Sequence, residues 1–383
     1  MERTYMSARS ARRERTDAFF LALELFVLIA AFRLRCSGIF HGNLPAVFIR
    51  HREGNLYLEW GRELLMYGRM GQADPIGHII LVALGEVTFG DLPFQHHLLT
   101  AFFGMLSIAV TYVLGRRWFS RAIGLLASAI MAISQLHILF SRWGEPQTPS
   151  IFFALFGILV FDTTIRRADN SCWPHILTGG LSGMVVVLHL SLGAFPLTVI
   201  SLAILYALRA LKREKESRGL WKVLLIGGSM ALPMLGSEGI VRVSRLFLED
   251  PSQLASPMGI TFIDLWVYNQ NMGGFHMPLP LYWLKILWQV EGAWLVWLVV
   301  AGWAYVATQL MKQQARGMWR GFAVITLVYS FTTLFTMGSG WREEYYVAGL
   351  LPAAVLTAAI VPGVLIRKGW EQSLRNGLER KSL

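Results

Sequence analysis

The sequence predicts an all-α, polytopic membrane protein: a single domain over residues 1–383 with about ten transmembrane helices. The chain is 54% hydrophobic and only 15% charged, whereas soluble domains carry about 25% charged residues. The apolar residues fall into runs close to the roughly 20 residues that a helix needs to cross a bilayer. We expect spans near residues 18–40, 98–115, 121–140, 149–165, 173–190, 193–209, 221–239, 291–311, 319–338 and 345–366.

The first apolar run follows an arginine-rich N-terminus and contains Glu24, Arg33 and Arg35. The run is long and no small-residue cleavage site follows it, so we interpret it as a retained transmembrane helix and not as a signal peptide. Ionisable residues are costly in lipid and usually face the interior of a helix bundle. We therefore expect Glu24, Arg33, His137 and His189 to point inward.

Basic residues predict the orientation of the chain in the membrane. The net charge of +11 is spread in clusters between the apolar runs, with no separate polar domain that would bind nucleic acid. Cytoplasmic loops are enriched in Lys and Arg, so the clusters place both termini in the cytoplasm. These clusters lie near residues 116–121, 166–167, 209–222, 312–320 and 367–381.

The outer face is then predicted to carry segments 41–97, 141–148, 240–290 and 338–346. Within the first of them, segment 76–90 is apolar but short and interrupted by glycines, so we expect a helix lying along the membrane interface. No soluble domain is expected after the last span. The two cysteines, Cys36 and Cys172, are predicted near opposite faces and should not form a disulfide.

The first outer loop, residues 41–97, combines charged and aromatic residues. Residues 54–67 predict an amphipathic helix with Trp60 on its apolar face, while Glu59 and Arg62 fall on a polar face, where they can pair or be solvated. Glu53 directly precedes this helix. A carboxylate in that place suits a general base, and the alternative is an acid favoured by the helix dipole.

Several motifs follow the arginine-bearing N-terminus in order: REGNLYLEWGRELLMYG (52–68), ADPIGHIILVALGEVTFGD (73–91), YVLGRRWFSRAIGLLA (112–127), LFSRWGE (139–145) and, as a looser match, WREEYYVAGLLP (341–352). Their order resembles that of the polytopic glycosyltransferases of the GT-C fold, in particular bacterial relatives of the protein O-mannosyltransferases and of the lipid A aminoarabinose transferases. The resemblance covers most of the chain and is strongest over residues 15–170. It implies a location in a bacterial plasma membrane.

This resemblance implies transfer of a sugar from a polyprenyl-phosphate donor to a hydroxyl of a lipid, glycan or protein on the non-cytoplasmic face. Such a displacement needs a base for the acceptor and cations for the departing phosphate. Guanidinium groups suit phosphate, so Arg142 and Arg342 are candidate ligands, with Lys285 as a third; headgroup contact or a structural ion pair is the alternative for each. Glu145 can orient Arg142 or help to hold a divalent cation.

The chain departs from the family pattern in the first loop. Where the resemblance leads us to expect Asp-Glu, the chain has Arg52-Glu53. Glu53 is then the candidate base, His51 is the second candidate, and Arg52 joins the candidate substrate-binding residues. Two alternatives stay open: a catalytically degenerate scaffold that serves as a subunit of a larger membrane complex, and a transporter or flippase, which the concentration of charge in the outer loops disfavours.

Overall fold

A computed structural model of the chain describes residues 2–37, 53–67, 76–90, 95–167, 171–189, 192–214, 218–245, 280–312, 318–338 and 349–379. Across these ranges the chain forms helices and contains no strand, which confirms the all-α class. The helices are α1 (Glu2–Cys36), α3 (Glu53–Tyr67), α4 (Ile76–Phe89), α5 (Gln95–Trp118), α6 (Arg121–Ile133), α7 (Gln135–Trp143), α8 (Gln147–Arg167), α9 (Trp173–Leu188), α10 (Ala194–Glu214), α11 (Arg218–Arg245), α13 (Pro280–Glu291), α14 (Ala293–Met311), α15 (Trp319–Gly338), α17 (Leu351–Ala358) and α18 (Ile360–Glu379).

Lipid-facing surface identifies the molecule as an integral membrane protein. Large apolar side chains are exposed on the outer helices, among them Phe26 and Ile29 of α1, Leu232 of α11 and Trp297 of α14. Soluble monomers rarely expose contiguous apolar surface on this scale. Within the described ranges, five helices are long and apolar enough to cross a membrane, or six if the bent pair α6 and α7 is one span.

The predicted count of ten spans is therefore not confirmed. Three further apolar helices, Gly77–Phe89, Trp173–Leu188 and Ala194–Arg209, are shorter than the length required. The apolar part of α1 contains three charged residues, which lower its hydropathy. The predicted span 121–140 is also not one helix, because the chain bends by 58° between α6 and α7.

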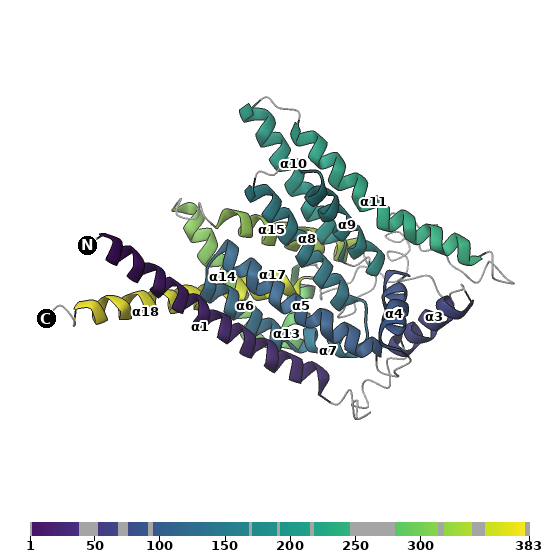
Figure 1. Cartoon of the computed structure of the whole chain (residues 1–383), viewed down its shortest axis with the longest axis horizontal. Helices are drawn as coiled ribbons and strands as arrows, with labels where there is room; N and C mark the ends of the chain where they lie inside the picture. The colour runs from purple at the N-terminus through teal and green to yellow at the C-terminus, as the bar shows by residue number, and fades with distance from the viewer. Residues whose placement is uncertain are drawn as a thin grey trace.

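The centre of the bundle is α17, in which all eight residues are buried. It packs against α14, α6 and α15, and Figure 1 shows it inside the ring of longer helices. Gly302 of α14 makes this packing close, since a Cβ atom there would meet the carbonyl oxygen of Thr357. Small residues allow helices in membranes to approach each other in this way.

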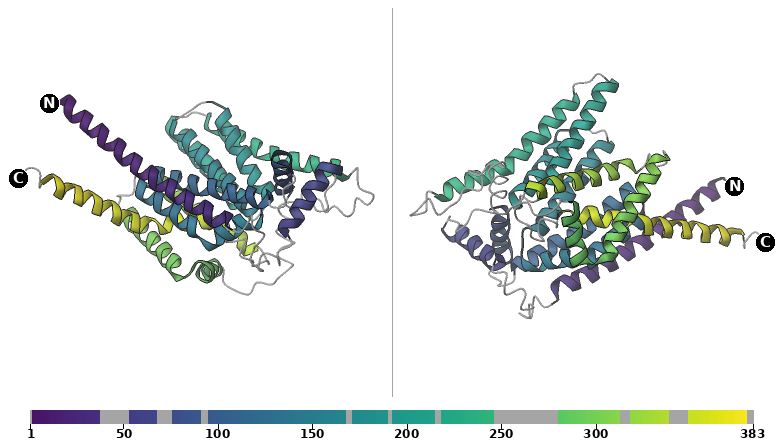
Figure 2. Two further views of the ribbon diagram at one scale, coloured as in Figure 1. Left: turned by 60° about the horizontal axis from the view of Figure 1, so that its bottom comes forward. Right: turned by 180° about the vertical axis from the view of Figure 1, so that it is seen from behind.

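The N-terminal half of α1 and the C-terminal half of α18 project side by side from one end of the molecule (Figures 1 and 2). Phe19 stacks on Trp370 with ring centroids 6.1 Å apart. At the same end, the carboxylate of Asp17 binds Arg116 at 3.0 Å and also binds Arg121. The first and last helices thus leave the bundle together, next to a basic cluster of the sequence.

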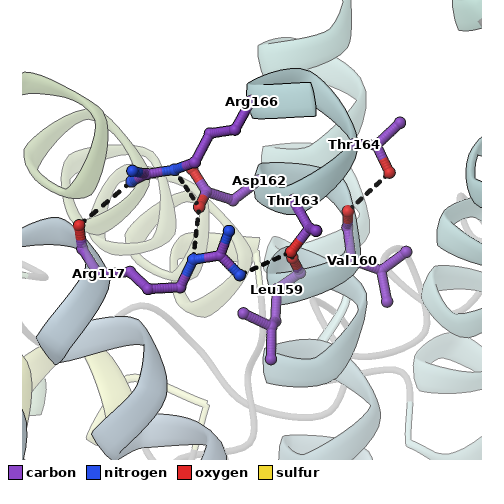
Figure 3. A network of polar contacts seen from close by, with 7 residues as sticks. All are labelled: Arg117, Leu159, Val160, Asp162, Thr163, Thr164 and Arg166. Carbon is purple, nitrogen blue, oxygen red and sulfur yellow. Dashed lines mark hydrogen bonds and ion pairs between the residues drawn. The ribbon is translucent and has the colours of Figure 1, made fainter. Parts of the chain in front are cut away.

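A second network ties α5 to α8 at this end (Figure 3). The carboxylate of Asp162 accepts from Nε of Arg166 at 2.8 Å and lies 3.5 Å from Nε of Arg117. Arg117 also donates to the hydroxyl of Thr163 at 2.7 Å, and Arg166 donates to the carbonyl of Arg117 at 3.2 Å. Cations are favoured at helix C-termini by the helix dipole, and Arg117 and Arg166 lie near the C-terminal ends of the two helices that the network joins.

Two of the ionisable residues expected to face inward are buried, namely Glu24 and His137, and His189 is partly buried. The expectation for Arg33 is wrong, because its side chain is exposed and Arg35 is the buried arginine of α1. Residues two apart on a helix lie on nearly opposite faces, so only one of the two can point into the bundle. Cys36 and Cys172 are both free, as predicted.

Helices α9 and α11 offer a matched test of close packing. A Cβ atom at Gly183 of α9 would meet the carbonyl oxygen of Met230, while one at Gly180 meets nothing within 4 Å. Overpacking costs about 1–3 kcal/mol, so we expect Gly183→Ala to lower the thermal unfolding midpoint of the detergent-purified chain and Gly180→Ala to leave it unchanged or raise it. Equal midpoints for the two variants would contradict the packing.

Candidate functional site

The candidate site lies at the end of the bundle opposite the projecting halves of α1 and α18, where Figure 1 shows α3 and α4. Helix α3 begins at Glu53, one residue before the predicted helix, and it ends at Tyr67 as predicted. Its buried Leu58 packs with Ile79 and Val82 of α4, and Trp60 and Leu64 cover the same cluster. The amphipathic pattern thus predicted the helix and the place of Trp60 on its packed side, but it did not predict that Leu58 is buried.

Helix α4 has the shortness that the sequence predicted, and one of its faces is buried in the protein. His78, Ile79 and Val82 on this face are all fully buried. Gly77 lies against the backbone of Val187 at the end of α9, so that a Cβ atom there would sit 2.9 Å from the carbonyl. Contacts with α3, α5 and α9 therefore hold α4 in place.

A chain of polar contacts joins α3, α4 and α5. Nε of Arg62 lies 2.8 Å from Oε1 of Glu86, and the other carboxylate oxygen of Glu86 accepts from the side-chain amide of Gln95 at 3.3 Å. Gln95 also donates to the carbonyl of Val82 at 3.3 Å. Arg62, which sequence reasoning placed on a polar face, is thus part of an inter-helix pair.

The segment 141–148 is held by His78 of α4 and His97 of α5. The ring Nε2 of His78 donates to the carbonyl of Gly144 at 2.6 Å, and Nδ1 of His97 donates to the carbonyl of Arg142 at 2.7 Å. Thr100 donates to the carbonyl of Ser141 at 3.0 Å. Burial lowers the pKa of His78 to about 4, although the bond to Gly144 opposes this, so its ring is a neutral donor at pH 7.

Two candidate residues, Arg142 and Glu145, are brought together on this segment. Arg142 is in the last turn of α7, and its Nη2 donates to the carbonyl of Ser37 at 2.7 Å, just beyond α1. Glu145 follows Gly144, which caps α7 in the left-handed conformation, and its side chain is buried. The bond to Ser37 gives Arg142 a structural contact, although its partner is a backbone carbonyl and not the carboxylate of an ion pair.

The other candidates are placed only in part. Lys285 is exposed on α13, a helix that packs against α7. The backbone of Glu53 forms the first residue of α3. His51, Arg52 and Arg342 lie outside the described residues, so their roles stay predictions.

Sequence reasoning missed the buried imidazoles of His78, His96 and His97 at this end. His96 is fully buried beside His97, with ring centroids 3.8 Å apart, and neither of its ring nitrogens has a hydrogen-bond partner among the described residues. His189 lies 3.4 Å from the side-chain nitrogen of Gln147. A signal was available, because His78, His96 and His97 flank or interrupt apolar runs, where polar groups are costly and usually functional or structural.

The described ranges contain no group of three or more His, Cys, Asp or Glu side chains that could hold a metal ion. Glu145 is the carboxylate of the segment 141–148, and it would supply only one of the six or more oxygen ligands that a calcium ion takes. The described residues therefore do not fit a divalent cation, and no step below is routed through one.

The turn at Gly144 gives a sharp test of this arrangement. Both Gly144 and Gly90 have a positive φ, +76° and +78°, but a Cβ atom at 144 would also meet the ring of His96, whereas one at 90 meets nothing. An alanine in the left-handed region costs about 1–2 kcal/mol. We expect Gly144→Ala to lower the thermal unfolding midpoint clearly more than Gly90→Ala, and an equal loss in both would contradict the contact with His96.

Comparison with known proteins supports one fold. Residues 73–236, less than half of the chain, match the dolichyl-phosphate-mannose-protein mannosyltransferase family. None of the curated protein sequences matches the chain. The crystal structure of the Archaeoglobus fulgidus oligosaccharyltransferase in the apo form is similar with a TM-score of 0.59 and 14% identity, covering 94% of this chain and 52% of that one.

Two other solved structures contain lipid phosphates. ArnT from Cupriavidus metallidurans, bound to undecaprenyl phosphate, is similar with a TM-score of 0.56 and 15% identity, covering 90% of this chain and 59% of that one. The oligosaccharyltransferase AglB from Archaeoglobus fulgidus, in complex with an inhibitory peptide and a dolichol-phosphate, is similar with a TM-score of 0.58 and 11% identity. The match covers 94% of this chain and 52% of that one. The chain spans little more than half the length of these proteins. It therefore has the fold of the GT-C membrane glycosyltransferases, and its residues 73–236 are similar to the mannosyltransferase family.

Proposed function

We propose that the chain is a glycosyltransferase of a bacterial plasma membrane, with both termini cytoplasmic, that uses a polyprenyl-phosphate-linked sugar as donor. The observation that carries this proposal is the fold, which over nine-tenths of the chain is similar to proteins solved with undecaprenyl phosphate or dolichol-phosphate. The family match over residues 73–236 supports it. The acceptor is a hydroxyl of a lipid, glycan or protein at the end of the bundle formed by α3 and α4.

The proposed reaction is a single displacement at the anomeric carbon. The acceptor oxygen forms the new bond to this carbon, the bond to the phosphate oxygen breaks, and the lipid phosphate leaves with its electron pair. Glu53 takes the acceptor proton, and His51 is the second candidate. Because negative charge develops on the phosphate oxygen, guanidinium groups nearby favour the transition state. Arg142 and Arg342 have this role, with Arg52 and Lys285 as further phosphate contacts and Glu145 supporting Arg142.

The position of Glu53 at the first residue of α3 suits a base. The positive end of the helix dipole favours the ionised form of an acid in the first turn. The same dipole accounts for an acid here without a catalytic role, so replacement of Glu53 decides between the two interpretations.

One feature of the sequence favours a second candidate function. Arg52-Glu53 stands where the resemblance leads us to expect Asp-Glu, and fold alone does not establish activity. The alternative is a scaffold without turnover that binds a partner protein in the membrane. Stoichiometric co-purification of such a partner, together with absence of turnover, would favour the scaffold over the enzyme.

The role of Glu53 is tested by replacing it. We expect Glu53→Gln to lower turnover with polyprenyl-phosphate sugars by about 10²–10⁴-fold, because that is the usual contribution of a general base. Glu59→Gln is the matched control, since Glu59 lies on the same helix and its side chain is exposed. Turnover is measured on the purified full chain with a panel of donors.

The outcomes separate the hypotheses. Equal turnover in Glu53→Gln and the wild type would move the base to another residue, with His51 next. Absence of donor binding and of turnover across a broad panel would contradict the transferase proposal as a whole.

The phosphate contact is tested separately at Arg142. We expect Arg142→Gln to weaken binding of undecaprenyl phosphate and to lower turnover by about 10²–10³-fold, as the loss of one transition-state donor does. Arg142→Lys, which keeps the charge, should lose less. Arg33→Gln, a change at an exposed arginine of α1, is the control. Unchanged lipid binding in Arg142→Gln would exclude Arg142 from the phosphate site.

A further inference from the structure

The helix break at Ser134 lies inside the protein and has a consequence for the candidate site. Helix α6 ends at Ile133, α7 begins at Gln135, and the two axes differ by 58°. Such a break leaves the last carbonyls of one helix and the first N–H groups of the next without helical partners. In a membrane these groups need partners within the protein, because there is no water to supply them.

The carbonyl side of the break is bound by Arg35 of α1. This side chain is 0% exposed. Its Nη1 donates to the carbonyls of Ala132 and Ala31, each at 3.1 Å, and its Nη2 donates to the carbonyl of Met131 at 3.3 Å. Nη2 also lies 2.6 Å from Nδ1 of His137. The positive charge therefore sits at the negative end of the α6 dipole.

The N–H side of the break is bound by Glu291, the last residue of α13. Its carboxylate is 6% exposed. It accepts from the hydroxyl of Ser134 at 2.6 Å, from the backbone N–H of Leu136 at 2.8 Å and from that of Gln135 at 3.2 Å. The negative charge thus sits at the positive end of the α7 dipole. Carboxylates that accept such backbone bonds form some of the stronger hydrogen bonds in proteins.

Stability alone does not account for this pair of buried charges. Apolar residues of similar volume often stabilise a protein as well as a buried ion pair does, because removing charges from water is costly. The charges compensate the broken helix instead, and in doing so they fix where α7 begins. At its other end α7 carries Arg142, whose guanidinium bonds to Ser37 at the end of α1. Helix α7 is therefore tied to α1 at both ends and to α13 at its start.

We propose that Arg35 and Glu291 are positioning residues that set the direction of α7 and thereby the place of Arg142 and Glu145 in the donor site. This inference rests on the proposed function for its catalytic consequence only. We call Arg35 and Glu291, on the two sides of Ser134, the helix clamp. Its effect on the start of α7 can be tested without measuring turnover.

The first measurement is hydrogen–deuterium exchange of the purified full chain, read in peptides that cover residues 134–148. Glu291→Ala removes the acceptor of two backbone N–H groups, and we expect exchange there to rise by about tenfold or more, as the loss of a charged hydrogen bond predicts. Glu291→Gln keeps one acceptor oxygen and should give a smaller rise. Arg35→Met should act on the same peptides, and Arg35→Lys should restore part of the protection.

Two matched controls separate the clamp from general loosening. Glu24 is also a buried acid bound to α6, through the hydroxyl of Ser128 at 2.6 Å, but it lies away from the break, so Glu24→Gln should leave the peptides 134–148 unchanged. Arg33→Met alters an exposed arginine two residues from Arg35. If Glu291→Ala raises exchange equally throughout the bundle, or not at all at 134–148, the clamp is contradicted.

The second measurement is steady-state kinetics with a polyprenyl-phosphate sugar. We expect Glu291→Gln to raise the KM for the donor and to leave the KM for the acceptor unchanged. Turnover should also fall, because a displacement of donor-site residues by about 1 Å can lower it by about 100-fold. Faster exchange with unchanged donor kinetics would contradict the positioning role. If the wild type itself shows no turnover, the proposed function fails, and binding of undecaprenyl phosphate by wild type and Glu291→Gln then decides the positioning role.

Discussion

The pairing of backbone groups inside a membrane is the constraint on which this structure depends. A straight helix satisfies it alone, since all its backbone bonds are internal. The pair α6 and α7 is bent, and the bend exists because side chains of two other helices take over the missing partners. A positive charge on the carbonyl end and a negative charge on the N–H end suit the two dipoles. The same contacts bind α1, α6, α7 and α13 into one unit.

The two ends of the bundle use charge differently. At the end from which α1 and α18 project, arginines bind aspartates and helix C-termini in networks that are partly open to solvent. Such partly exposed pairs contribute little to stability. At the other end, the neutral imidazole of His78 and the ring of His97 donate to the backbone of segment 141–148. Neutral donors can be buried at lower cost than charged ones, so this end holds a loop without adding charge to it.

This division bears on the proposed chemistry. A donor phosphate would meet a segment whose backbone is fixed by His78 and His97 and whose start is fixed by the break at Ser134. Catalytic groups must be held close to the productive geometry, and the residues behind them do this. In this chain the supporting contacts come from α1, α4, α5 and α13, which are far apart in the sequence.

Hydropathy and periodicity determined much of the fold without the structure. They predicted the all-α class, the positions of most helices, and a helix over residues 54–67, which the structure shows one residue longer at its start. These are local properties, since a 20-residue apolar run or a repeat of 3.6 residues can be read in a single segment. The predicted number of spans is not confirmed, because several runs form helices shorter than a bilayer requires within the described residues.

Only the tertiary structure decided which ionisable residues are buried and what they bind. Arg33 and Arg35 are equivalent in the sequence, yet Arg35 alone reaches the carbonyls of α6. The break at Ser134 could not be predicted from the sequence for the same reason, because Glu291, which binds Ser134, lies 157 positions away. A helix break in an apolar run depends on charges supplied by other helices, and a local pattern carries no information about them.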